Sequence, residues 1–143
     1  MSNFDGPPNW SALTAYEAGY NMVKTTNYYY LCTTSGTSAS VAPTWPTTFG
    51  NTVTDGSIVW TCVAHARRTW RSSTAYVPQP LNTPYPWPDQ IVTGGAGSPV
   101  VQCILGGTSG VTEPAWSTTL GATTYDSFGS APGGVTWATV GYA

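Results

Sequence analysis

The sequence predicts an all-β protein made of two tandem, small β-sandwich or barrel-like modules with long loops rich in Ser, Thr, Gly and Pro. The first observation is an internal duplication within the 143 residues, which indicates repeated structural units. The second is composition: 7% of residues are charged, and seven Trp and nine Tyr are too many aromatics for a disordered chain. The third is that no stretch of ten residues has convincing helical periodicity.

The duplicated segment covers residues 32–63 and returns over residues 103–140. Each copy contains, in order, a cysteine, Gly-Thr-Ser, Pro-x-Trp, Thr-Thr, a glycine, an aspartate and a strand centred on tryptophan. Three pairs are offset by 71 residues: Cys32 and Cys103, Trp45 and Trp116, and Asp55 and Asp126. The offset is 77 at Trp60 and Trp137, which indicates a six-residue insertion within residues 128–135.

An earlier segment is repeated as well. Residues 10–16 match residues 70–76 at an offset of 60, so the second copy gains eleven residues before its cysteine. We therefore expect an extended N-terminal arm at 1–9, a first β module at 10–66, and a second β module at 67–143 with an insertion at 77–99. Modules of this size are near the lower limit for a self-supporting core.

The elements of the first module follow from local patterns. Residues 10–16 and 21–24 are short strands, residues 28–33 form a strong strand, and residues 52–54 form a brief one. Asp55-Gly56 is a tight hairpin signal, and residues 58–63 form the closing strand. Between them, residues 35–48 form a Ser-, Thr- and Pro-rich loop.

The second module repeats this order with different loops. Its insertion carries Pro-Tyr-Pro-Trp-Pro, ending at Pro88, and should be extended. Residues 100–105 form the strand after it, residues 106–119 form the Pro-x-Trp loop, and residues 135–140 form the closing strand. A looser glycine loop over residues 127–134 replaces the tight turn of the first module.

The repeated residues are interpreted mainly as scaffold. Trp60 and Trp137 should be core residues, and burial of Trp45 and Trp116 would pin the polar loops to the sheets, with a ligand role as the alternative. Aspartate before the closing strand should accept local backbone hydrogen bonds. The proposed repeat scaffold comprises Trp10, Tyr16, Trp45, Asp55, Trp60, Trp70, Tyr76, Trp116, Asp126 and Trp137.

Tyr85 and Trp87 differ from these residues because they have no counterpart in the first copy. Neighbouring prolines keep them from pairing in a sheet, and aromatic residues on an insertion are candidates for an exposed contact surface. The alternative is that both rings fold back onto the second module.

Charge and chemistry exclude several classes of function. A net charge of −2 without a basic block argues against nucleic-acid binding, and Arg67, Arg68 and Arg71 are interpreted as a solvated linker. No apolar run is long enough to span a membrane. We find no catalytic acid pair, no metal-ligand spacing and no cofactor motif, so we expect neither enzymatic activity nor a bound metal or cofactor.

The cysteines and the N-terminus bear on the cellular location. Three cysteines are an odd number, and Thr139 occupies the position that matches Cys62, so we expect reduced, buried thiols. The beginning of the chain, MSNFDGPPNW, has neither a basic start nor an apolar core. We therefore expect no secretory signal and synthesis in a cytoplasm.

The order of motifs in the first copy resembles a known module. Thr-Ala-Tyr, Tyr-x-Cys, Gly-Thr-Ser, Pro-Thr-Trp-Pro, Thr-Val-Thr-Asp-Gly and Val-x-Trp-Thr-Cys-Val follow one another. This pattern resembles a module common in structural proteins of tailed bacteriophages, over nearly all of residues 10–63 and more loosely over 70–140. The second copy departs from it: no glycine follows Asp126, Thr139 replaces the second cysteine, and an insertion is present.

This resemblance implies a virion protein. We expect a capsid decoration or cement protein, with a head fibre or tail component as close relatives. Its partners would be the major capsid protein or other virion proteins, and self-association is possible. The front of the module also resembles small chitin- and cellulose-binding modules, through Trp10, Tyr16, Gly19, Val23 and Tyr30. The alternative is therefore a carbohydrate-binding module for host-surface or cell-wall glycans, with Tyr85 and Trp87 as the contact residues.

Overall fold

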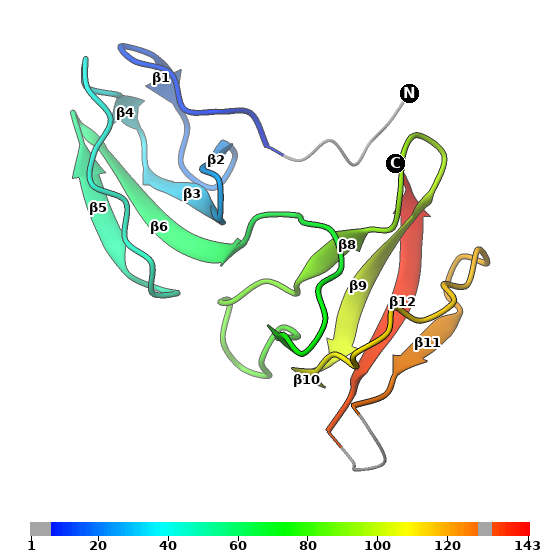
Figure 1. Ribbon diagram of the computed structural model, residues 1–143. Helices are drawn as coiled ribbons and strands as arrows, with labels where there is room; N and C mark the ends of the chain where they lie inside the picture. The colour runs from blue at the N-terminus through cyan, green and yellow to red at the C-terminus, as the bar shows by residue number, and fades with distance from the viewer. Residues whose placement is uncertain (1–6, 129–132) are drawn as a thin grey trace. The chain divides into compact units, whose positions relative to one another are not determined.

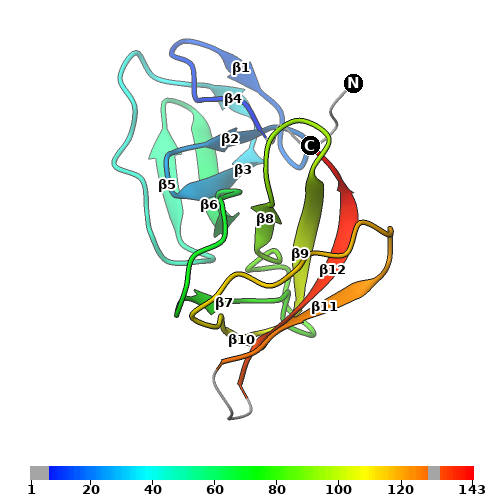
Figure 2. The ribbon, with the colours of Figure 1, turned by 45° about the vertical axis from the view of Figure 1, so that its right-hand side comes forward.

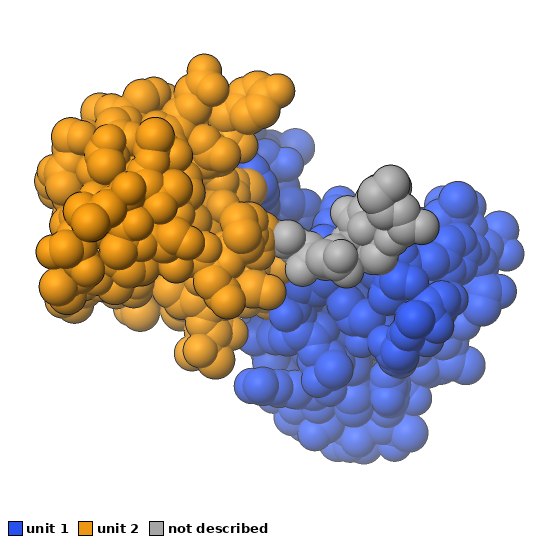
Figure 3. Space-filling view, turned by 90° about the horizontal axis from the view of Figure 1, so that it is seen from above, with its two compact units in different colours: residues 1–6, 67–82, 87–143 blue, residues 7–66, 83–86 orange. Residues whose placement is uncertain are grey.

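A computed structural model describes residues 7–128 and 133–143, which form two compact units (Figure 3). The N-terminal unit contains Pro7–Ala66 and Thr83–Pro86 and is orange in Figure 3. The C-terminal unit, in blue, contains Arg67–Asn82 and Trp87–Ala143. The expected arm falls largely outside the described residues. Its last part belongs to the N-terminal unit, because the Lys24 backbone N–H donates to the Pro8 carbonyl over 2.9 Å.

Each unit combines a four-stranded antiparallel sheet with a two-stranded one (Figures 1 and 2). In the N-terminal unit the orders are β2-β3-β6-β5 and β1-β4. The strands are β1 (Ala15–Tyr16), β2 (Met22–Lys24), β3 (Tyr28–Thr34), β4 (Gly36–Thr37), β5 (Thr52–Asp55) and β6 (Ile58–His65). No helix occurs in the part of the chain that the structure describes, and the predicted all-β fold of two similar modules is confirmed.

The C-terminal unit repeats the same topology. Its sheets have the orders β8-β9-β12-β11 and β7-β10. The strands are β7 (Ala75–Tyr76), β8 (Gln90–Val92), β9 (Pro99–Leu105), β10 (Gly107–Thr108), β11 (Thr123–Asp126) and β12 (Val135–Tyr142). The pairing register is also repeated, since Tyr30 lies opposite Cys62 in the first unit and Val101 lies opposite Thr139 in the second.

Strand β8 corrects the expected insertion at 77–99. It pairs with β9 as β2 pairs with β3, so it belongs to the repeated frame. The Cys32 N–H donates to the Asn21 carbonyl, and the Cys103 N–H donates to the Asp89 carbonyl, both over 2.9 Å. Asn21 and Asp89 are thus equivalent at an offset of 68. Of the eleven additional residues, eight (68 minus 60) precede Asp89, and three (71 minus 68) lie between β8 and β9.

The opening segment of each unit is shorter as a strand than expected. Only Ala15–Tyr16 of residues 10–16 is paired, and only Ala75–Tyr76 in the second copy. Leu13 and Ser73 have φ angles of 51° and 49°, which are left-handed conformations that end an extended strand. The same break therefore recurs in both copies.

The hairpin predicted at Asp55-Gly56 is confirmed, because β5 ends at Asp55 and β6 begins at Ile58. Gly56 has a φ of 60°, and a Cβ built there would lie 2.3 Å from the Thr37 carbonyl oxygen. Both the backbone conformation and the lack of space require glycine at this turn.

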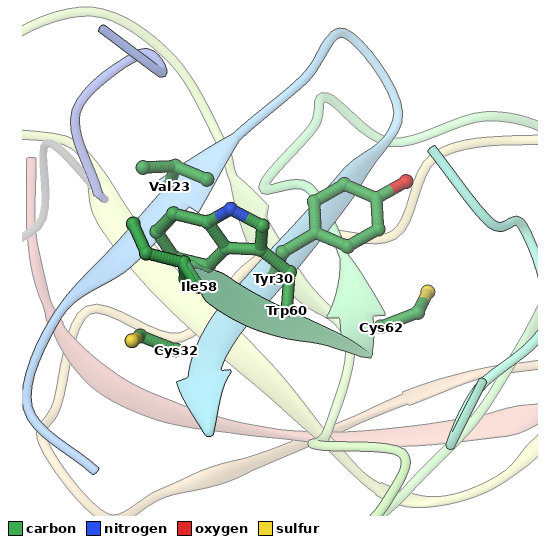
Figure 4. Close-up of a cluster of buried hydrophobic side chains, with 6 residues drawn as sticks. All are labelled: Val23, Tyr30, Cys32, Ile58, Trp60 and Cys62. Carbon is green, nitrogen blue, oxygen red and sulfur yellow. The ribbon is translucent and has the colours of Figure 1, made fainter. Parts of the chain in front are cut away.

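A tryptophan occupies the middle of each core. Trp60 and Trp137 are fully buried. Figure 4 shows the Trp60 indole between Tyr30 on one side and Val23 and Ile58 on the other. Tyr16 packs edge-on against Trp60 with ring centroids 4.8 Å apart, and Tyr76 does the same against Trp137 at 4.8 Å. The opening segments thus attach to the cores through equivalent aromatic pairs.

The aspartate before each closing strand joins distant parts of its unit. Asp55 Oδ2 accepts hydrogen bonds from the indole N–H groups of Trp10 at 2.7 Å and Trp60 at 2.9 Å. Its Oδ1 accepts one from the Ala39 backbone N–H at 2.9 Å. The expectation of local backbone hydrogen bonds is therefore wrong: this carboxyl is buried, its one backbone donor is 16 residues away, and its other donors are two indole N–H groups.

Asp126 repeats the arrangement with one donor fewer. It accepts from the Trp70 indole N–H at 2.7 Å and from the Gly110 backbone N–H at 2.8 Å. Trp137 Nε1 is buried and has no acceptor among the described residues, whereas the equivalent Trp60 donates to its aspartate. The carboxyl thus satisfies three donors in the first unit and two in the second.

We predict that Asp55→Ala lowers the free energy of unfolding by about 3 kcal/mol, because it strands three donors in a buried site. Asp126→Ala should cost roughly 1 kcal/mol less, since it strands two. Urea unfolding followed by tryptophan fluorescence measures both, with Asp55→Asn as the control that keeps one acceptor oxygen. An unchanged urea midpoint for Asp55→Ala would contradict the role assigned to this carboxyl.

Candidate functional site

Three acidic side chains, those of Asp55, Glu113 and Asp126, have partners within their own units. Asp55 and Asp126 hold the tryptophans described above, and Glu113 Oε1 accepts the Trp116 indole N–H over 2.8 Å. Within residues 7–128 and 133–143, no three His, Cys, Asp or Glu side chains are grouped to hold a metal ion. The same residues contain no helix with the length and apolar character needed to cross a bilayer.

Asp89 is a scaffold residue that the sequence analysis missed. It is buried, and its Oδ2 accepts the Val77 backbone N–H over 2.8 Å. In the first unit, Asn21 Oδ1 accepts the Glu17 backbone N–H over 2.7 Å. An alignment of β8 with β2 would have shown that Asp89 is equivalent to Asn21. The residues around Asp89 did not by themselves indicate that the insertion contains a repeated strand.

The arginines expected in a solvated linker pack instead within the C-terminal unit. The guanidinium of Arg68 lies 4.7 Å from the centre of the Tyr76 ring and 3.5 Å from Asp89 Oδ2. Arg67 donates to Gln90 Oε1 from Nε at 3.1 Å and from a terminal nitrogen at 2.8 Å. The linker interpretation is therefore wrong for these two residues, because their guanidinium groups contact Tyr76, Asp89 and Gln90 of the second unit.

The Pro-x-Trp loops are pinned to the cores by their tryptophans. The Trp45 ring lies 4.5 Å from Tyr30 and 6.0 Å from Trp60, measured between centroids, and Trp116 lies 5.8 Å from Trp137. Both rings are half-buried. Their packing corresponds to the scaffold role that the sequence analysis preferred over a ligand role.

A second contact holds each loop, and its donor differs between the units. The Tyr30 hydroxyl donates to the Pro46 carbonyl over 2.8 Å in the first unit. In the second, the Thr139 hydroxyl donates to the carbonyl of Ser117, the residue equivalent to Pro46, over 2.7 Å. At the positions of Tyr30 and Cys62 the second unit has Val101 and Thr139. The hydroxyl donor therefore comes from β3 in the first unit and from β12 in the second.

All three cysteines are buried and free, which agrees with the expected reduced thiols. Cys32 and Cys62 lie on the adjacent strands β3 and β6, but Cys32 is opposite Trp60 and Cys62 is opposite Tyr30. Figure 4 shows their sulfur atoms on opposite sides of Trp60. Burial raises the pKa of Cys62 to about 11 and that of Cys103 to about 12.

Tyr85 and Trp87, the candidate contact residues, are both half-buried. The Tyr85 carbonyl accepts a hydrogen bond from the Thr83 hydroxyl over 3.0 Å, within the same loop. Tyr85 falls in the segment grouped with the N-terminal unit and Trp87 in the C-terminal unit. Their role as a joint contact surface stays a prediction.

The four-stranded sheet of the C-terminal unit carries three exposed apolar residues that the sequence analysis did not consider. Ile104, Leu105 and Tyr125 are 46%, 61% and 54% exposed. Their equivalents at an offset of 71 are Thr33, Thr34 and Thr54. Comparing the two copies position by position would have found this difference.

The chain matches no family model, no curated protein and no solved structure. The geometry within each unit, together with the order of motifs in the sequence, is therefore the basis for a functional proposal.

We predict that Tyr30→Phe and Thr139→Val each lower the free energy of unfolding by about 1 kcal/mol, since each leaves a loop carbonyl without its donor. Thr136→Val is the matched control, because Thr136 lies on the same strand as Thr139 but on the other face of the sheet. Urea unfolding measures the three variants. Equal midpoints for Thr139→Val and Thr136→Val would contradict the assigned hydrogen bond.

We also predict that stability falls as the pH rises above 9. The folded pKa values of Cys62 and Cys103 lie above the ordinary 9.0, so the unfolded chain releases protons that the folded chain retains. Each group contributes a slope of up to about 1.4 kcal/mol per pH unit between pH 9 and its folded pKa. Urea unfolding at pH 7, 9 and 10 with a reductant tests this, and Cys62→Thr, which copies the second unit, should reduce the slope. A flat profile across this range would contradict the prediction.

Proposed function

We propose that this chain is a structural protein of a tailed-bacteriophage virion, acting as a decoration or cement protein that attaches to the head and stabilises it. A head fibre or a tail component is a related form of the same proposal. The motif order that resembles phage structural modules supports this class. Its partners would be the major capsid protein or other virion proteins, after synthesis in the host cytoplasm.

The observation that carries the proposal is the duplicated frame. Both units keep the same topology, the same strand register and the hydrogen bond from the opening tryptophan to the buried aspartate, so the buried carboxyls serve the scaffold. The outward positions differ between the units, as at Thr34 and Leu105. Buried aspartates that hold tryptophan side chains are not available as catalytic groups, which supports a non-enzymatic role.

The first test asks whether the chain belongs to the particle. Virions purified from the phage that encodes it should contain the protein in many copies by mass spectrometry. Particles from a phage that lacks the gene should bind the added protein saturably and resist heat or chelator treatment better afterwards. Absence from purified virions, together with no binding to the deficient particles, would overturn the proposal.

A truncation shows in this assay whether the N-terminal arm or a β module attaches the protein to the particle. Removal of residues 1–6 is the appropriate deletion, because residues 8 and 9 contact Lys24 and belong to the first unit. We predict that this deletion weakens attachment at least tenfold if the arm binds the shell. Saturation at wild-type affinity would assign attachment to a face of a unit instead.

A parallel arm of the experiment addresses the glycan alternative. The purified protein is sedimented with chitin, cellulose and bacterial cell walls, alone and as the Tyr85→Ala/Trp87→Ala variant. Saturable binding that the double variant loses would favour a carbohydrate-binding module. Binding to particles without binding to any polysaccharide would favour the virion protein.

A further inference from the structure

The exposed residues that are identical in both copies of the repeat lie on one turn of each unit. Residues 33–54 align with residues 104–125 at the constant offset of 71, and eleven of these aligned positions are exposed in both units. Seven of the eleven carry different residues, and the other four are identical. All four lie within residues 47–52 and 118–123, which are called the threonine turns below. The identical residues are Thr47, Thr48, Gly50 and Thr52 in the first unit and Thr118, Thr119, Gly121 and Thr123 in the second.

The two threonine turns have the same backbone hydrogen bonds. The Gly50 N–H donates to the Cys62 carbonyl, and the Gly121 N–H donates to the Thr139 carbonyl, each over 2.8 Å. In each turn the N–H of the residue after the glycine donates to the carbonyl of the second threonine, at 3.1 Å in the first unit and 3.0 Å in the second. The two turns therefore present their side chains from equivalent positions.

Backbone structure explains only part of this identity. Gly50 and Gly121 have φ angles of 87° and 81°, which favour glycine. Thr52 and Thr123 begin β5 and β11, where a β-branched residue is favoured. Neither reason applies to the two adjacent threonines that open each turn. Their side chains are exposed, and their hydroxyls make no hydrogen bond with the residues that the structure describes.

The loop directly before each turn has changed at every position that is exposed in both units. Ser40, Val41, Ala42 and Thr44 of the first copy correspond to Val111, Thr112, Glu113 and Ala115 of the second. The threonine pairs begin three residues later and are unchanged. Identity of exposed side chains that have no internal contact indicates a partner to which both units bind.

The composition of the turns limits the chemistry of this partner. Neither threonine turn contains a charged residue, so each offers hydroxyl and methyl groups to a polar, uncharged surface. A chain with two equivalent surfaces binds most strongly to a partner that presents the same site more than once. A shell of identical subunits provides such a repeat.

We infer that the two threonine turns are equivalent attachment surfaces, which bind the same uncharged site on two subunits of the virion head. This inference rests on the proposed function and adds a bridging mechanism to it. A chain attached through both turns links two subunits and resists their separation, whereas a chain attached through one turn only covers the shell.

The test uses particles that lack the protein, to which purified variants are added. The first variant is Thr47→Ala/Thr48→Ala. The second is Thr118→Ala/Thr119→Ala. Each should raise the dissociation constant at least tenfold, and by similar factors, because each removes one of two linked contacts. At saturating concentration both should still coat the particles but lose the heat resistance that the wild type confers. The quadruple variant should not bind measurably.

The matched control is Thr44→Ala/Thr112→Ala, which removes one exposed threonine from each unit outside the turns. Neither position has threonine in the other copy. This control should change the dissociation constant less than twofold. Urea unfolding of every variant should give the wild-type midpoint, since the replaced side chains are all exposed.

The outcomes separate this inference from the proposed function. Failure of the wild type to bind the particles would overturn the proposed function and the inference with it. Binding of the wild type together with equal binding of the quadruple variant would overturn the inference alone. A loss confined to one of the two turns would do the same, because the surfaces would not be equivalent. Polysaccharide binding that the quadruple variant loses, without an effect on particle binding, would assign the turns to a glycan instead.

Discussion

The buried aspartate before each closing strand is the contact on which the rest of each unit depends. Asp55 joins the opening segment through Trp10, the loop through Ala39, and the central strand through Trp60. A unit of this size has a small core, so specific polar contacts contribute a large share of its stability. Burying a carboxyl without partners costs free energy, which explains why several donors converge on it.

The two units show which parts of this frame can change. Asp126 keeps two of the three donors, and the donor that holds the Pro-x-Trp loop moves from Tyr30 to Thr139. The loop carbonyl is satisfied in both cases, because an acceptor that loses water must find another donor. Duplication thus preserved the hydrogen bonds rather than the residues that make them.

Outward positions of the two sheets also differ between the copies. In the N-terminal sheet Thr34 and Thr54 flank Val59, whereas in the C-terminal sheet Leu105 and Tyr125 flank Thr136. Binding functions that differ between the copies therefore belong to outward side chains and loops. The proposed virion role uses such surfaces and leaves the frame unchanged.

The sequence by itself determined the all-β class, the duplication, the two core tryptophans and the hairpin at Asp55-Gly56. These follow from alternation, motif order and turn chemistry, which are local properties of the chain. The tertiary structure alone decided the partners of Asp55 and Asp126, the place of Arg68, and the strand β8 inside the expected insertion. Trp10 is 45 residues from Asp55 and Trp70 is 56 from Asp126, so these contacts exist only once the sheets have formed and brought distant segments together.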